Sequence, residues 1–251
     1  MAKQAGMGCA LYAGGYDVGG DTQAFTVHGG PVALDLTDIT QSAFFRLGGE
    51  RSAEVNWTSF MDTAAGAEHD ALSGLPLTDQ IETVLLNPVA VGCPALSQVS
   101  KQIGYDPTRG ADGSLTFALS GQSNAFGQEW GVALTPGRRV DVAATAAGPS
   151  NSFDTGASLS FGAQMYVHLI AFAGTSVTIK LQDSADNITF LDIAGTSLTT
   201  TALTAGHQAV RVSVPNTTVI RRYIAVATVG TFTSADFVVQ VTKNPIANVV
   251  F

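Results

Sequence analysis

The chain has 251 residues and a formal net charge of −8 at pH 7, and only 13% of its residues are Asp, Glu, Lys or Arg. A soluble domain typically contains about 25% charged residues. The surface of this protein is therefore rich in neutral polar residues, or hidden against neighbouring subunits, or both. Its four lysines are too few for the basic patch that neutralises phosphates, which argues against tight binding of DNA or RNA.

The negative charge is concentrated in the first part of the chain. Residues 1–147 contain 15 acidic and 7 basic residues, which gives −8, whereas residues 148–251 contain 5 of each. Cys9 and Cys93 are too few for a disulfide scaffold, so we expect two reduced thiols. We expect neither a signal peptide nor a membrane span, because the N-terminus has no apolar stretch of that type and no run of about 20 apolar residues occurs.

The first part of the chain is predicted to form strands and one helix. Phe25–Leu36 is predicted to be a strand, and residues 53–59 alternate between apolar or small and polar side chains, which is typical of a strand with one buried face. Thr63–Leu75 is the helix candidate, with Asp62 or Thr63 as N-cap and Pro76 after its end. Further extended segments are predicted at 79–86, 95–105, 114–120 and 130–142.

A change in composition divides the chain into two predicted domains. Residues 143–155 consist almost entirely of Ala, Gly, Pro, Ser, Asn and Thr, which is typical of a linker. We therefore assign residues 1–145 to an α+β domain with one helix, 146–155 to a linker and 156–251 to a β-sandwich of Ig-like or jelly-roll-like type. The expected fold class is mostly β. Alternating strands in the last part are predicted around 165–169, 177–181, 210–214 and 237–241.

No motif for catalysis, cofactor binding or metal binding is recognisable. The four histidines have no metal-ligand spacing, and neither the glycines near the N-terminus nor the acidic loops fit a nucleotide or calcium template. Glu68, His69 and Asp70 are consecutive on the candidate helix and point in different directions, so we interpret them as a solvated helix face rather than an acid–base pair. We expect a protein that is not an enzyme and has no cofactor.

Four segments resemble the major tail tube proteins of long flexible-tailed, siphovirus-type bacteriophages, especially those of actinobacterial hosts. They are Gly29–Asp35, Phe44–Gly49, Val55–Phe60 with the Ala-rich helix after it, and Lys101–Arg109. The resemblance covers roughly residues 1–145. It implies a β-barrel-like tube domain with one flanking helix, hexameric rings that join sheet edges, and stacking of these rings into a tube through which DNA passes.

The resemblance also implies partners and a location. The partners would be further copies of the chain and other tail proteins, namely the tape measure, terminator and distal tail proteins, with DNA passing without adhesion. The protein would be synthesised in the host cytoplasm and located in the tail of the virion. The acidic excess of the tube domain would then repel DNA from the wall of the bore, and Glu54, on the polar side of its strand, is our candidate for an acid that faces the lumen.

Phe44, Phe45 and Arg46 are our candidates for contacts between subunits. They lie in a predicted connection of about 16 residues between two strands, which is long for a hairpin, and Phe and Arg are enriched in interfaces. The connection is similar to the long loop with which tube proteins reach the neighbouring ring. The alternative, in which both phenylalanine rings cap the core of their own domain, remains open at this stage.

Two other classes of function also remain open. The chain could be a head-decoration or cell-surface carbohydrate-binding protein, because the C-terminal domain resembles both tube-decorating sandwich modules and carbohydrate-binding modules; Tyr223 or Phe190 would then stack on a host-surface glycan. The chain could also be a glycoside hydrolase, which requires two carboxylates that converge to roughly 5 to 9.5 Å.

Overall fold

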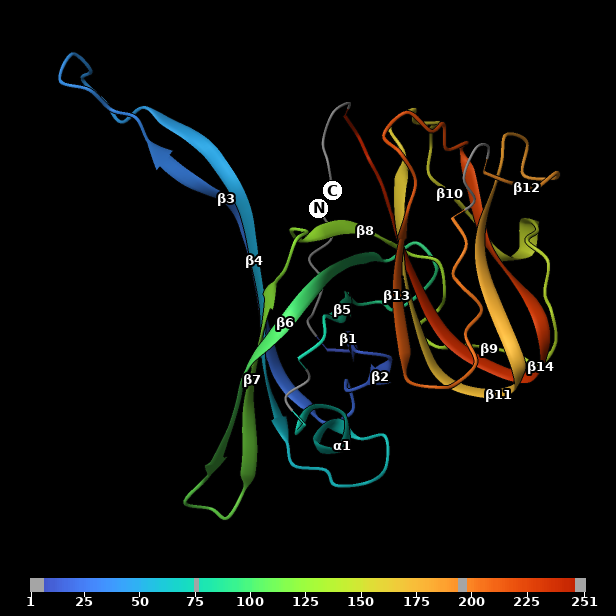
Figure 1. The fold of residues 1–251 in the computed structure, drawn as a ribbon, viewed down its shortest axis with the longest axis horizontal. Helices are drawn as coiled ribbons and strands as arrows, with labels where there is room; N and C mark the ends of the chain where they lie inside the picture. The colour runs from blue at the N-terminus through green and yellow to red at the C-terminus, as the bar shows by residue number, and fades with distance from the viewer. Residues whose placement is uncertain (1–6, 75–76, 194–197, 247–251) are drawn as a thin grey trace.

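Strands make up most of the chain in the computed structural model, which describes residues 7–74, 77–193 and 198–246 (Figure 1). The prediction of a mostly β protein with one short helix is confirmed. The helix is α1 (Glu68–Leu72), and a 3₁₀ turn, η1, spans Pro149–Asn151. The strands are β1 (Ala10–Ala13), β2 (Tyr16–Asp17), β3 (Thr22–Asp35), β4 (Arg46–Phe60), β5 (Gln80–Leu85), β6 (Pro94–Arg109), β7 (Leu115–Ser123), β8 (Glu129–Ala133), β9 (Arg139–Asp141), β10 (Ser152–Asp154), β11 (Ala163–Ser184), β12 (Leu191–Asp192), β13 (Gln208–Ser213) and β14 (Tyr223–Lys243).

The first part of the chain is built on the antiparallel sheet β3–β4–β7–β6. Alternation along β4 sends Val55 and Trp57 into the core and leaves Glu54 and Asn56 on the opposite, half-exposed face. Strand β6 pairs with β7 through its second half and with β5 through its first half, so it belongs to two layers. The core between these layers consists of Leu11, Ala13, Val18, Val55, Trp57, Leu72, Val84, Leu96, Phe117 and Leu119.

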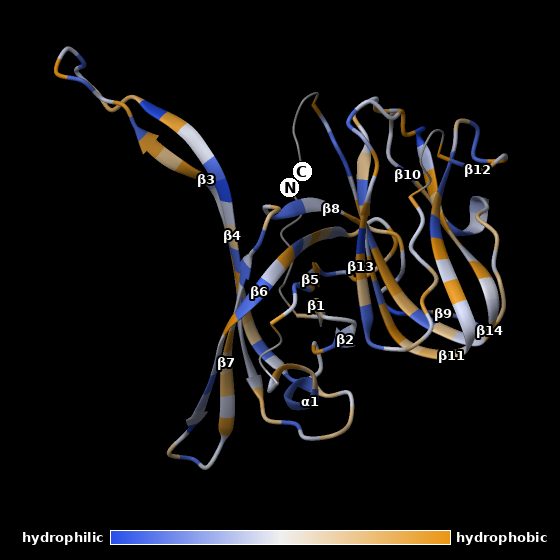
Figure 2. Cartoon of the chain, viewed as in Figure 1, coloured by the Kyte–Doolittle hydropathy of each residue, from blue (hydrophilic) through white to orange (hydrophobic). Residues whose placement is uncertain are grey.

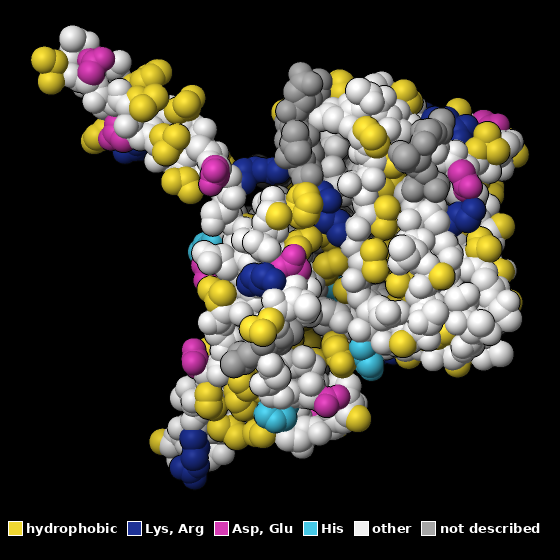
Figure 3. All heavy atoms as spheres, in the orientation of Figure 1, with side chains coloured by type: hydrophobic (Ala, Val, Ile, Leu, Met, Phe, Trp, Pro, Cys, Tyr) yellow, Lys and Arg dark blue, Asp and Glu magenta, His cyan; other side chains and the backbone are white. Residues whose placement is uncertain are grey.

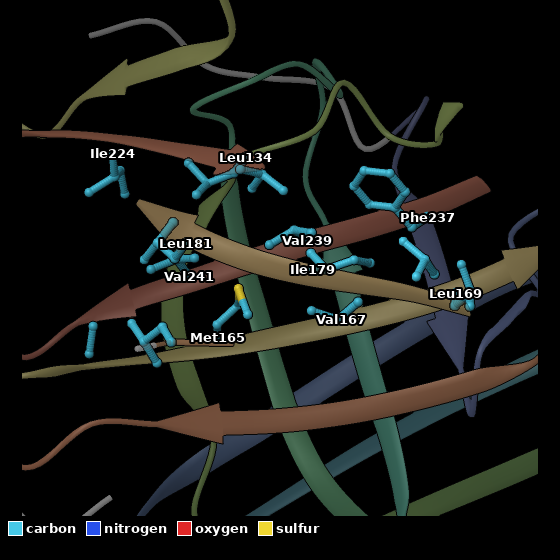
Figure 4. Packing of buried hydrophobic residues seen from close by; sticks show 14 of the residues in the cluster. Leu134, Met165, Val167, Leu169, Ile179, Leu181, Ile224, Phe237, Val239 and Val241 are labelled. Atoms are coloured by element: carbon cyan, nitrogen blue, oxygen red, sulfur yellow. The ribbon is translucent and has the colours of Figure 1, made fainter. Parts of the chain in front are cut away.

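The last part of the chain depends on two very long strands that bend together. Strands β11 and β14 pair along almost their whole length, with irregularities in register between Leu169 and Ser176. Gly174 and Gly230 have φ angles of 155° and 138°, where a Cβ atom would come within 2.4 Å of Phe232 Cα and 2.2 Å of Ser176 O respectively. Because the strands bend here, both halves of each contribute to one core, as Figure 4 shows for β11 and β14.

Strand pairing also joins the first and last parts of the chain. Strand β8 pairs with β6 on one side and with β14 on the other. Strands β9 and β10 pair with β14 as well. Residues 146–155, predicted to be a linker, therefore contain η1 and β10, and the second half of this stretch is hydrogen-bonded to β14.

Buried polar side chains fix this junction. The imidazole of His168 on β11 accepts a hydrogen bond from Gly15 N at Nδ1 (3.2 Å), so its Nε2 carries the proton and donates to Thr83 Oγ1 (2.8 Å). Complete burial lowers the pKa of His168 to about 3 and keeps the ring neutral. Nearby, Arg211 donates to Glu129 Oε1 (2.8 Å) and to the Tyr166 hydroxyl (3.0 Å).

The helix and the long connection of the first part of the chain are both shorter than predicted. The helix is limited to Glu68–Leu72, because Gly66 adopts a φ of 81° and Asp62 accepts a hydrogen bond from Ala64 N in a turn before the helix. Leu75, the predicted end of the helix, lies outside the described residues. The predicted connection of about 16 residues is also shorter than expected, because β4 already begins at Arg46 and pairs with Asp35.

Glu82 is one of the acids in the first part of the chain that are buried, and no basic side chain among the described residues pairs with it. The carboxylate of Glu82 on β5 accepts a hydrogen bond from Gln98 Nε2 (2.7 Å), and burial raises its pKa to about 7. It lies against Gly121 of β7, where an added Cβ atom would be only 1.8 Å from Glu82 Oε1. The folded chain therefore holds a proton on Glu82 more tightly than the unfolded chain does.

This proton makes stability depend on pH. Because the pKa of Glu82 is higher in the folded chain than in the unfolded chain, proton binding by Glu82 adds to the free energy of unfolding. This contribution is fully present below the unfolded pKa and is lost as pH rises through about 7. We expect Glu82→Gln to remove this loss and to make the chain more stable than wild type at pH 8 by roughly 2 kcal/mol, with little difference at pH 4. Urea denaturation of monomeric protein at both pH values measures this, and equal pH dependence in the two proteins would contradict it.

Candidate assembly surfaces

The distal part of the β3–β4 hairpin projects away from the rest of the chain as an arm (Figure 1). We define the arm as residues 31–51. Strand β7 pairs with β4 only from Glu54 to Phe60. In the arm, the strand partner of β3 among the described residues is therefore β4 alone, and that of β4 is β3 alone. A two-stranded ribbon has no second layer and cannot bury the side chains of either face.

The arm nevertheless carries many apolar side chains (Figure 2). Their exposed fractions range from 46% for Leu34 to 103% for Ile39. Large contiguous apolar surface on a soluble protein usually marks a site of interaction with another molecule. The exposed apolar residues of the arm are Val32, Leu34, Leu36, Ile39, Phe44, Phe45 and Leu47.

Hydrogen bonds shape the tip of the arm. Leu36 N donates to Phe45 O (2.9 Å), and Phe45 N donates to Thr37 Oγ1 (2.9 Å). The carboxylates of Asp35 and Asp38 each accept two hydrogen bonds, from Thr37 and Thr40 respectively, and these bonds lower the pKa of both acids. These hydrogen bonds, which fix the turn, all join residues of the arm itself.

The three residues predicted to contact other subunits lie at this tip. Phe44 is 72% exposed and Phe45 is 52% exposed, so the alternative in which both rings cap the core of their own domain does not hold. The guanidinium of Arg46 lies over the Phe44 ring, 4.6 Å from its centroid. Their role in contacts between subunits stays a prediction.

Sequence reasoning did not identify the other apolar residues of the arm as interaction candidates. Val32, Leu34 and Leu36 fall within the predicted strand Phe25–Leu36, and a buried strand has the same apolar composition. The available signal was the neighbouring Gly29-Gly30-Pro31 and Gly48-Gly49, which favour an edge ribbon over a central strand.

The β3–β4–β7–β6 sheet presents its outer face without cover from the described part of the chain. We call this surface the small polar face, because the ladder register places mostly small or polar residues on it: Ala24, Thr26, His28, Ser52, Glu54, Asn56, Thr58, Phe60, Lys101, Gly104, Asp106, Thr108, Thr116, Ala118, Ser120 and Gln122. Glu54, the predicted lumen-facing acid, lies on this face and accepts a hydrogen bond from Ser120 Oγ (3.1 Å). That it faces a lumen stays a prediction.

The same sheet has an unpaired edge on each side. Among residues 7–74, 77–193 and 198–246, strand β3 pairs only with β4, and β6 from Gly104 onward pairs only with β7. Ile103, at the irregularity just before this free segment of β6, is 57% exposed. Pro31 and Pro107 lie on the two edges, and prolines at such positions restrict which strands can pair there.

The strands at the two free edges run in opposite directions. Each neighbouring pair in β3–β4–β7–β6 is antiparallel, so β3 and β6 are antiparallel as well. The β3 edge of one copy could therefore continue the sheet beside the β6 edge of another without changing its antiparallel pattern.

The interpretation of Glu68, His69 and Asp70 as a solvated helix face is wrong for Glu68. Glu68 is 2% exposed, and its carboxylate accepts a hydrogen bond from Trp57 Nε1 (2.5 Å), which joins the short helix to β4. Burial raises the pKa of Glu68. His69 Nδ1 instead pairs with the Tyr105 hydroxyl (2.6 Å), so the helix closes one end of the core.

The structure gives little further support to the other candidates from the sequence, which are the two aromatic residues suggested for glycan stacking. Tyr223 and Phe190 are half-buried, and the Arg222 guanidinium lies 5.1 Å from the centre of the Tyr223 ring. Among the described residues, no group of three or more His, Cys, Asp or Glu side chains could hold a metal ion. No helix within the same ranges is long and apolar enough to cross a membrane. Cys9 and Cys93 are both free thiols.

No family model matches the sequence, and no curated protein matches it. Solved structures that align with it include the tail of an empty gene transfer agent particle, refined with C6 symmetry (14% identity, 43% of this chain, 80% of that chain, TM-score 0.36). A virion of a native gene transfer agent particle aligns at 13% identity over 50% and 97% of the chains, with a TM-score of 0.40. The Dit hub protein of phage SPP1 aligns at 11% over 93% and 98%, with a TM-score of 0.33. None is close enough to place the chain in a family.

The exposure of the arm predicts how two phenylalanines will respond to the same change. We expect Phe45→Asp to alter the unfolding free energy of the monomer by no more than about 0.5 kcal/mol, because the ring has no core to leave. Phe117, which is 6% exposed, is the matched control, and Phe117→Asp should prevent folding or cost several kcal/mol. Circular dichroism during urea denaturation checks both; unfolded Phe45→Asp protein would show that the ring supports the fold.

Proposed function

We propose that the chain is a structural subunit of a bacteriophage tail and, more specifically, the tube protein of a long flexible, siphovirus-type tail. The observation that carries the proposal is an arm whose apolar side chains are left uncovered by the described part of the chain, on a sheet whose two edge strands, antiparallel to each other, have no further partner among the same residues. In a soluble monomer these surfaces would stay exposed to water, whereas contacts between identical copies in a polymer would bury them.

The free edges support ring formation. If β3 of each copy pairs with β6 of the next, every copy makes the same head-to-tail contact, and the contact closes into a ring when the rotation between copies is a fraction of a turn. Closure into a barrel removes both edges. Six copies per ring is the symmetry that the resemblance to tube proteins implies, and it forms part of this proposal.

The small polar face supports the assignment of the inner wall. The other side of the sheet carries the core, the β1–β5 layer and, joined through β8, the bent strands β11 and β14. These layers are too large for the inside of a ring of sheets and fit only on its outside. In this proposal the small polar face therefore lines the bore, and the last part of the chain lies on the outer surface of the tube.

The charge of the small polar face suits the passage of DNA. Glu54 and Asp106 lie on it, and Lys101, in register with Gln122, is paired with Asp79 (2.7 Å). Acids repel phosphates over about 8 Å at physiological salt, which keeps DNA off the wall without excluding it. In this proposal the other partners are the tape measure, terminator and distal tail proteins.

Electron microscopy tests the proposal. Purified wild-type protein in negative stain at rising concentration should show stacked rings or hollow tubes, and end-on averages should show six subunits. Phe45→Asp should give folded protein that does not form tubes, whereas Ile188→Asp, a change at a 77% exposed side chain outside the arm, should polymerise like wild type. Small particles at every concentration, with and without tail tips added as nuclei, would contradict the proposal.

The bore can be tested in assembled virions. Phage with Glu54→Lys and Asp106→Lys should eject DNA more slowly in vitro, because the added ammonium groups attract phosphates instead of repelling them. Asp192→Lys is the control, since Asp192 lies on β12 in the last part of the chain. Ejection with unchanged kinetics in the double variant would remove the assignment of these acids to the inner wall.

A further inference from the structure

We infer that the cavity between β8 and β10 is a binding site for a small amphipathic anion, a molecule with an apolar body and one negatively charged head. The cavity has a volume of about 460 Å³, which is within the range of small-molecule sites. The inference is independent of the proposed function, since it concerns neither the arm nor the free edges of the first sheet. The residues that line the cavity are Trp130, Gly131, Val132, Phe153, Asp154, Thr155, Leu159, Ile224, Val241 and Lys243.

The cavity lies between two strands that border β14 at separate places. Strand β8 pairs with β14 at Gln240 and Val241, near the end of β14, and β10 pairs with residues 223–225, near its start. Because β14 bends between these places, Ile224 and Val241 from its opposite ends lie in the same core, as Figure 4 shows. No pairing within the described part of the chain joins β8 to β10. The core is therefore open to solvent between these two strands.

The lining of the cavity is mostly apolar. Ile224 and Val241 belong to the core, and the half-buried side chains of Val132 and Phe153 pack against it. Trp130 is 54% exposed. An exposed indole beside an opening to the core offers a large apolar surface to a ligand. The lining thus favours a ligand with an apolar body.

The place of Trp130 depends on the glycine that follows it. An added Cβ atom on Gly131 would lie only 2.0 Å from Val241 O. A residue with a side chain would therefore push β8 away from β14. Because Gly131 permits this close approach, Trp130 lies next to the end of β14 and lines the same cavity as Lys243.

Lys243 brings one positive charge to the cavity. Its ammonium donates hydrogen bonds to Thr155 Oγ1 (2.7 Å), Ala157 O (2.8 Å) and Arg221 O (3.3 Å), which are all neutral oxygens. Among the described residues, no carboxylate forms an ion pair with it. Figure 3 shows both hydrophobic and basic side chains at the surface near β8. An anion in the cavity would supply a partner for this charge.

The acids whose charges act on Lys243 already have other partners. Asp154 accepts a hydrogen bond from Arg222 Nε (2.8 Å), and Asp183 accepts one from Arg221 Nε (2.7 Å). These three bases and two acids leave an excess of one positive charge. Burial lowers the pKa of Lys243 to about 8, and the two carboxylates oppose this shift only in part. A negatively charged head is therefore favoured at this end of the cavity.

Two compounds that share one apolar body test the site. Anilinonaphthalene sulfonate carries a negative charge, and phenylnaphthylamine is the same body without the sulfonate group. Fluorescence titration of the monomeric wild-type chain should show one bound anilinonaphthalene sulfonate per chain. Trp130→Ala should weaken the binding of both compounds at least about fivefold, because it removes apolar surface that both contact.

The charge of the head is tested at Lys243. Lys243→Gln should weaken the binding of anilinonaphthalene sulfonate by about tenfold or more and change that of phenylnaphthylamine less than about twofold, because only the first compound is attracted by the ammonium. Lys180→Gln is the matched control, since Lys180 lies outside the cavity lining and pairs with Asp192 (3.1 Å). It should leave the binding of both compounds unchanged.

A pH titration of the wild-type chain gives a readout that needs no substitution. An anion favours the protonated form of Lys243, so the affinity for anilinonaphthalene sulfonate should fall as pH rises above about 8, whereas that for phenylnaphthylamine should stay constant. The other charged groups around Lys243 are Asp154, Asp183, Arg221 and Arg222.

Three results would overturn the site. They are the absence of binding by either compound, equal affinities for anilinonaphthalene sulfonate at pH 7 and pH 9, and binding that neither Trp130→Ala nor Lys243→Gln weakens. The last result would assign the bound compounds to another apolar surface, such as the arm.

Discussion

Strand β6 is the element on which the rest of the structure depends. It is hydrogen-bonded to β5 and β8 through its first half and to β7 through its second half, with an irregularity in register between Gln102 and Gly104 where it turns from one layer to the other. It therefore borders the core of the first part of the chain and forms one edge of the β3–β4–β7–β6 sheet. Through its pairing with β8, which also pairs with β14, it is connected to the last part of the chain. A single strand thus connects the sheet that carries the arm to the last part of the chain.

The two parts of the chain behave as one body because the junction is polar and buried as well as paired. A neutral His168 bridges Gly15 and Thr83, and the ion pair of Arg211 and Glu129 lies in the same region. Buried polar contacts contribute little net stability when they form, but breaking one partner leaves an unsatisfied group and is costly. The junction therefore favours one orientation of the two parts relative to each other.

A chain with 13% charged residues and an uncovered apolar arm would be prone to aggregation if its edges could pair at random. Pro31 and Pro107 on the two free edges limit such pairing, and the hydrogen-bonded turn at the arm tip presents its aromatic rings in one arrangement. Together these features limit nonspecific association through the edges and the arm.

The sequence by itself determined the mostly β class and most strand positions, because side-chain alternation and turn residues act locally. It also named Phe44, Phe45 and Arg46 as candidates for contacts between subunits, and that role stays a prediction. Only the tertiary structure decided that Val32–Leu36 belongs to an exposed ribbon rather than a central strand, since a strand with two apolar faces reads the same in either place. It also decided that Glu68 is buried on Trp57 and that β8 pairs with β14. These features depend on which distant segments meet, and no local pattern encodes that.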